Sequence, residues 1–123
     1  MRGTFFVAAL SLLAQALFAG RAGADTTPPS VPSGLVQTGA TLTTIDLAWA
    51  PSTDDVGVTE YRLYQFFKGR FPSLNRYDLI LDHLASPAVT LTVPSNTSAS
   101  YSVAARDAAG NESAKSAIVA ART

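Results

Sequence analysis

The fold of this chain is decided by the stretch Tyr101-Ser-Val-Ala-Ala-Arg-Asp-Ala-Ala-Gly-Asn-Glu-Ser113. In its first half every second side chain, at Tyr101, Val103 and Ala105, falls on one face. A period of two predicts a β-strand that buries that face. The glycine and asparagine in the second half tolerate positive φ angles, so a tight reversal of the chain is expected directly after the strand.

The same alternation occurs before Pro51, where Ile45, Leu47 and Trp49 share one face. Further β-patterned runs lie at residues 59–67, 88–93 and 114–121, and turn-forming clusters separate them. Short strands at this spacing predict an all-β sandwich or barrel.

The segment 68–87 fits two structures. Tyr77, Leu79 and Leu81 alternate with their neighbours, which favours a short strand with these three residues on one face. A stripe that includes Leu74 and Leu84 also fits a helix. The strand is the prediction, and the helix stays as the alternative because periodicity alone separates such short runs poorly.

Residues 1–24 have the layout of a secretory signal peptide. Arg2 precedes a 15-residue apolar run from Phe5 to Ala19, and a small-residue stretch ends at Ala24. A membrane-spanning helix needs roughly 20 apolar residues, so cleavage and export to a periplasm or the exterior are expected. The remaining chain suits one domain, at residues 35–123, behind a Pro-rich lead-in at residues 25–34 that is expected to act as a stiff spacer.

Composition excludes several functions. The chain has no cysteine and a single histidine, so zinc bound by thiolates is excluded and a histidine-based metal site is disfavoured. Two of the nine basic residues, Arg2 and Arg21, lie in the predicted signal peptide. The rest of the chain therefore carries seven basic against nine acidic residues, a balance that does not attract nucleic acid.

Taken together, the motifs resemble a fibronectin type III domain. They occur in the order Pro32-x-x-Leu35, Leu47-x-Trp49, Tyr61-x-Leu63, Tyr101-x-Val103-x-Ala105 and the turn at residues 107–113. The stretches at residues 49–58 and 105–111 are similar to the bacterial subgroup that is appended to secreted polysaccharide-degrading enzymes. The resemblance covers residues 28–123.

The resemblance implies an immunoglobulin-like two-sheet antiparallel sandwich of about seven strands. Trp49 would then lie in the core, and the hydroxyl of Tyr101 would bond back to the chain a few residues upstream in a tyrosine corner. The loop before Tyr101 departs from the family pattern. A second departure is the long segment 66–87, where relatives have a short turn, and insertions of this kind often carry function.

Aromatic and basic side chains gather between residues 61 and 77. Alternation turns Tyr64 and Phe66 outward beside Arg62, and exposed rings stack on sugars or anchor interfaces. These three residues and Phe71 are the candidate ligand-binding residues. The alternative is that most of the rings pack into the core.

No catalytic residue, metal site or cofactor is expected. Asp54, Asp55 and Asp107, like Asp78 and Asp82 beside His83, are ordinary turn formers without the ligand spacing of a calcium loop. No nucleophile elbow accompanies the histidine.

The expected function is a non-catalytic, exported fibronectin type III module that serves as a spacer or protein-interaction domain. The alternative is an accessory carbohydrate-binding module of a polysaccharide-degrading system. We expect a monomer whose partner is a protein or polysaccharide surface, without nucleic acid and without a membrane after removal of the signal peptide.

Overall fold

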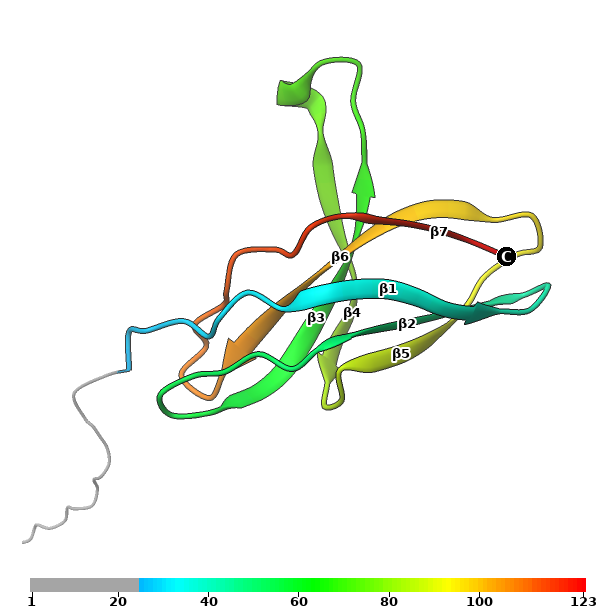
Figure 1. Cartoon of the computed structure of the whole chain (residues 1–123). Helices are drawn as coiled ribbons and strands as arrows, with labels where there is room; N and C mark the ends of the chain where they lie inside the picture. The colour runs from blue at the N-terminus through cyan, green and yellow to red at the C-terminus, as the bar shows by residue number, and fades with distance from the viewer. Residues whose placement is uncertain (1–24) are drawn as a thin grey trace, which may run out of the picture.

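The computed structural model describes residues 25–123, so the predicted signal peptide lies outside the described residues. Within this range seven strands form two antiparallel sheets (Figure 1). The first sheet has the order β1-β2-β5, with β1 at Ser33–Ala40, β2 at Thr44–Ala50 and β5 at Ala88–Thr92. The second has the order β4-β3-β6-β7, with β4 at Arg76–Leu84, β3 at Val58–Phe67, β6 at Ser98–Asp107 and β7 at Val119–Arg122.

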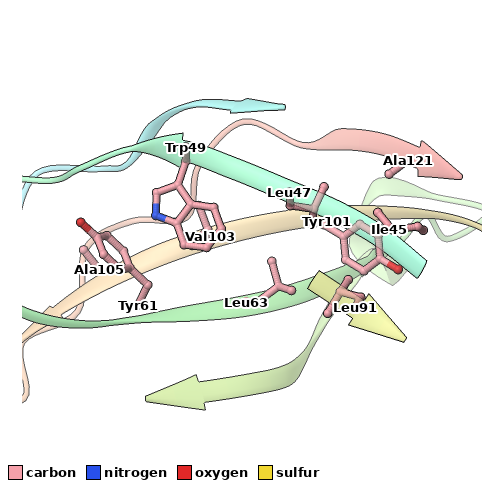
Figure 2. Packing of buried hydrophobic residues seen from close by; sticks show 10 residues of the cluster. All are labelled: Ile45, Leu47, Trp49, Tyr61, Leu63, Leu91, Tyr101, Val103, Ala105 and Ala121. Carbon is pink, nitrogen blue, oxygen red and sulfur yellow. The ribbon is translucent and has the colours of Figure 1, made fainter. Parts of the chain in front are cut away.

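The predicted two-sheet sandwich is confirmed, and its core lies between the sheets (Figure 2). Ile45, Leu47 and Trp49 of β2 are at most 5% exposed, as their alternation predicts. They meet Val103 of β6, which is fully buried, and the ring of Trp49 contacts Tyr61 edge-on at 5.4 Å between centroids. Without disulfides, this burial of apolar surface is the main stabilising term.

Tyr101 lies in the same core at 2% exposure, but the tyrosine corner is absent. Within residues 25–123 its hydroxyl makes no hydrogen bond, and it borders a cleft between the sheets. Burial raises the pKa of Tyr101 above its usual value. A different tyrosine bonds to the backbone: the Tyr61 hydroxyl accepts the N–H of Ser52 at 3.0 Å. The corner prediction is therefore wrong, and the loop before Tyr101 is also where the sequence departs from the family pattern.

The last strand is shorter than predicted because two serines replace part of the ladder. The hydroxyls of Ser113 and Ser116 accept the backbone N–H groups of Ala105 and Val103, each at 3.0 Å. The backbone N–H groups of the two serines in turn donate to the carbonyls of Ala105 and Val103, each at 2.8 Å. Regular pairing with β6 begins only at β7.

The segment 68–87 contains the predicted strand, β4, which pairs with β3. A short 3-10 turn, η2 at Pro72–Leu74, precedes it at the tip of the hairpin. In Figure 1 the upper half of this hairpin projects beyond both sheets.

Alternation along β4 does not hold. Leu63 of β3 lies opposite Leu81, whereas the next residue, Tyr64, lies opposite Leu79, so Ile80 is the extra residue of a β-bulge. Leu81 packs against the core, and Leu79 shares the outer face with Tyr64. The prediction that Tyr77, Leu79 and Leu81 share a face is therefore wrong.

The Pro-rich lead-in is held against the sandwich. Pro29 and Pro32 are buried, and the N–H of Ser30 donates to the carbonyl of Thr53 at 2.8 Å. The N-terminal residues thus follow the domain surface as far as Asp25, whose carbonyl accepts the amide of Asn111 at 2.8 Å.

Candidate functional site

Tyr64 points to the outer face of the four-stranded sheet, as alternation predicts, but it is not available for contact. It is 8% exposed. Its hydroxyl donates to Glu112 at 2.5 Å, and the Lys115 ammonium lies 4.4 Å from the centre of its ring. Burial raises the pKa of Tyr64, and the bond to Glu112 raises it further. The expectation that Tyr64 is an open contact residue is wrong, because Glu112 and Lys115, which lie far from it in the sequence, cover it.

Arg62 lies beside Tyr64 and is committed to two carboxylates. Its guanidinium donates to both oxygens of Asp82, at 3.0 and 3.3 Å, and to Glu112 at 3.1 Å. The contact with Tyr64 raises the pKa of Arg62, and the two carboxylates raise it further. Partial burial favours a higher pKa for Asp82, but the His83 N–H and the guanidinium hold it below the usual value. This bidentate geometry serves the sheet itself and leaves few donors for a ligand.

The other predicted contact residues lie on the projecting hairpin. Phe66 packs against Tyr77 with ring centroids 5.1 Å apart and planes tilted by 55°. Phe71 is 59% exposed at the tip. Phe67 is covered by the guanidinium of Arg76, 4.1 Å from its ring centre. The structure therefore does not bring Tyr64, Phe66 and Phe71 into one flat row, and a ligand at these residues stays a prediction.

Three exposed aliphatic residues of the hairpin were not among the predicted site residues. Leu74, Leu79 and Ile80 are 59%, 45% and 37% exposed. In the sequence Leu79 looks like a core residue because apolar alternation normally indicates burial. Ile80 falls on the opposite face with Asp78 and Asp82, and Leu74 fits only the alternative helical stripe. The signal that could have indicated their exposure was the insertion between residues 66 and 87. A segment added to a sandwich extends beyond the facing sheet, so that sheet cannot cover its side chains.

The first of two groups of possible cation ligands lies near the N-terminal end of the described chain. Oxygens of Asp25, Asp54 and Asp55 lie within 4.8 Å of one another. The N–H of Thr27 favours the charged form of Asp25, but the neighbouring Asp107 carboxylate and burial outweigh it and raise the pKa of Asp25.

Asp107 itself is 3% exposed. Burial favours a higher pKa for this carboxyl, but bonds from the side chain and backbone of Asn111 hold its pKa below the usual value.

The second group combines Glu60, Asp82 and His83. Glu60 already pairs with Arg106 at 3.3 Å, and Asp82 pairs with Arg62. These guanidinium groups compete with any cation for the same oxygens. The expectation that this chain needs no metal remains a prediction.

The clefts described in residues 25–123 offer little for catalysis. The cleft between the sheets, about 290 Å³, is lined by Gln65, Tyr101, threonines and aliphatic residues, without a carboxylate or histidine. A second cleft has Asp46 as its one carboxylate, and that oxygen accepts the Thr90 hydroxyl at 2.7 Å. Neither brings an acid and a base together.

Two antiparallel sheets, packed over Trp49 and closed by the turn after β6, define an immunoglobulin-like sandwich. No helix in the described part of the chain has the length and hydropathy to cross a membrane. Comparison with known proteins shows which proteins are similar to this chain.

No family model matches the chain. Chitinase Chi52 of Paenibacillus xylanexedens is 38% identical over 92 residues, which make up 75% of this chain and 16% of that protein. Exoglucanase A of Cellulomonas fimi is 37% identical over 100 residues, 80% of this chain and 11% of that protein. The fibronectin type III domain of human fibronectin type III domain containing protein 3 superposes with a TM-score of 0.60 at 21% identity, covering 81% of this chain and 91% of that one.

This chain has the fold of a fibronectin type III domain, and its sequence relatives are regions of bacterial chitinases and exoglucanases. It spans about a sixth or less of the length of these relatives.

Proposed function

We propose that this chain is an exported, non-catalytic fibronectin type III module, which serves as a spacer or protein-interaction domain in a polysaccharide-degrading system. The observation that carries the proposal is the extent of the match: the whole sandwich corresponds to only 11–16% of each relative described above. The clefts without paired acid and base groups support the non-catalytic role.

The proposed absence of catalysis is tested with purified protein expressed from the full 123-residue sequence. The protein is incubated with insoluble chitin and with cellulose. We expect no release of soluble reducing sugar above that of a protein-free control, while an authentic chitinase or cellulase releases it under the same conditions. Sugar release that copurifies with the protein would refute the proposal.

Export is tested on the same preparation. We expect N-terminal sequencing of protein recovered outside the cytoplasm to begin at Asp25, because the small residues up to Ala24 form the predicted cleavage site. An intact N-terminus retained in the cytoplasm would count against export.

A second candidate, carbohydrate binding, is favoured by the exposure of Phe71 at 59% and Tyr77 at 40%. It would use these rings with Phe66 to stack on sugar faces. We expect retention on insoluble chitin or cellulose that is lost in a Phe71→Ala, Tyr77→Ala variant and kept in a Leu42→Ala control, since Leu42 is 80% exposed elsewhere on the surface. No retention of the unaltered protein would exclude this candidate.

A further inference from the structure

The upper half of the β3–β4 hairpin, residues 66–80, is called the arm below. Every residue from Phe71 to Ile80 is exposed. Half of the exposed large apolar side chains in the described part of the chain fall in these ten residues, namely Phe71, Leu74, Tyr77, Leu79 and Ile80. A patch of this kind on a small domain marks an interaction surface.

The arm is also the basic pole of the molecule. It carries Lys68, Arg70 and Arg76 against a single acidic residue, Asp78, which pairs with Arg76 at 3.2 Å. Lys68 and Arg70 have no carboxylate within 4.0 Å in residues 25–123. The remainder of the described chain has four basic against eight acidic residues, so an arm of net charge +2 extends from a body of net charge −4. This distribution selects an acidic partner.

The arm has a free sheet edge as well. Among residues 25–123, β4 is the outermost strand of its sheet and pairs with β3 alone. Its other edge presents backbone N–H and C=O groups that are open to an added strand. Side chains on both sides of that edge would contact alternate residues of the added strand.

We infer that the arm binds an extended, acidic segment of a protein partner, which adds as a strand along β4 and places its carboxylates near Lys68 and Arg70. This inference rests on the proposed role as an interaction module, and it identifies the arm as the surface that performs this role. A second copy of the chain is a poorer occupant because two arms of like charge repel each other. A sugar chain is poorer too, since it could stack on the rings of Phe71 and Tyr77 but would leave the exposed Leu74, Leu79 and Ile80 without an apolar partner.

The test uses a synthetic ten-residue peptide in which glutamate alternates with valine or tyrosine, carrying a fluorescent label. We expect its anisotropy to rise on titration with the protein. In ¹⁵N-labelled protein the largest amide shifts should fall on β4. A peptide with lysine in place of glutamate, and a peptide N-methylated at alternate residues so that it cannot pair as a strand, should each bind at least about fivefold more weakly.

Matched variants test the surface. Arg70→Glu should weaken binding of the acidic peptide by about fivefold, and 0.5 M salt should weaken binding of the unaltered protein. Arg122→Glu makes the same change in net charge away from the arm and should leave binding unchanged. Both positions are exposed, so circular dichroism should show an intact sandwich in both variants.

Several results would overturn the inference: no binding of the acidic peptide, equal binding of the lysine or N-methylated peptide, or equal loss in Arg70→Glu and Arg122→Glu. Preferential binding to vesicles that contain phosphatidylglycerol, or self-association that Arg70→Glu abolishes, would instead assign the arm to another occupant. Failure of the peptide test with no sugar release leaves the proposed module role standing. Sugar release by the protein removes that role whatever the peptide does.

Discussion

At the scale of single residues, Ser116 shows how a hydroxyl takes the place of a strand. It is 6% exposed, accepts the N–H of Val103 at 3.0 Å and donates to the carbonyl of Ala117 at 3.0 Å. Ser116→Ala would leave the buried Val103 N–H without that acceptor, and an unpaired buried group costs about 1–3 kcal/mol. We therefore expect the free energy of unfolding in urea to fall by that amount.

Ser73→Ala is the matched control, because Ser73 is exposed at the tip of the arm and its hydroxyl makes no hydrogen bond within residues 25–123. Its unfolding midpoint should stay at that of the unaltered protein. If Ser116→Ala unfolds at the same urea concentration as Ser73→Ala, water or backbone adjustment satisfies Val103 and the serine is not a structural substitute for the ladder.

At the scale of the elements, the arm is an addition to the sandwich. Phe67 and Arg76 lie directly opposite each other at the ends of β3 and β4, so an Asn-Gly turn in place of residues 68–75 would close the hairpin there. The side chains removed contact little of the core, and shortening a loop changes its closure entropy only slightly. We expect thermal unfolding to show a stability within about 1 kcal/mol of the unaltered chain.

The same shortened chain should lose the binding of the acidic peptide, since it lacks Lys68, Arg70 and the exposed Phe71. A loss of several kcal/mol on shortening would contradict this view, because it would make the tip part of the folded core.

The elements differ in how far the sequence predicts them, and packing explains the difference. β2 was predicted with its correct faces, because Ile45 lies where both sheets overlap and burial there enforces strict alternation. In β6 the inward face was predicted correctly at Val103, but Ser102 and Ala104, which alternation turns outward, are fully buried as well. In β4 the strand was predicted but its faces were not, since the bulge at Ile80 shifts the pairing with β3 by one residue and so reverses the faces on its two sides. Alternation in sequence carries no sign of such a bulge.

The candidate site was predicted less well for a related reason. Alternation correctly turned Tyr64 outward, but the residues that cover it, Glu112 and Lys115, come from the segment after β6. Long-range cover of this kind is a property of the tertiary structure. The cluster of aromatic and basic residues was visible in the sequence, whereas its division between a buried tyrosine and an exposed arm was not.

At the scale of the whole molecule, two regions of the domain have opposite electrostatic character. The arm is basic, while Asp25, Asp54, Asp55 and Asp107 gather where the lead-in meets the turn after β6. Asn111 joins the two segments, because its side chain donates to the carbonyl of Asp25 and to the carboxylate of Asp107. The lead-in is thus attached to the sandwich at a point where like charges oppose the attachment.

This repulsion makes the stability of the attachment depend on pH. The pKa of Asp25 is raised in the folded chain, so its protonated form is favoured there, and the stability that this gives at low pH is lost as pH rises through the folded pKa. Asp25→Asn removes the charge but keeps the carbonyl that accepts Asn111. We therefore expect Asp25→Asn to unfold at a higher urea concentration than the unaltered chain at pH 7, with the difference shrinking as pH falls below about 4. Both chains are measured uncleaved, so that no α-ammonium group adjoins residue 25. Asp46→Asn is the control, since Asp46 lies on β2 outside this cluster. A gain from Asp25→Asn that persists unchanged at pH 3, or no gain at pH 7, would show that repulsion at this end does not limit stability.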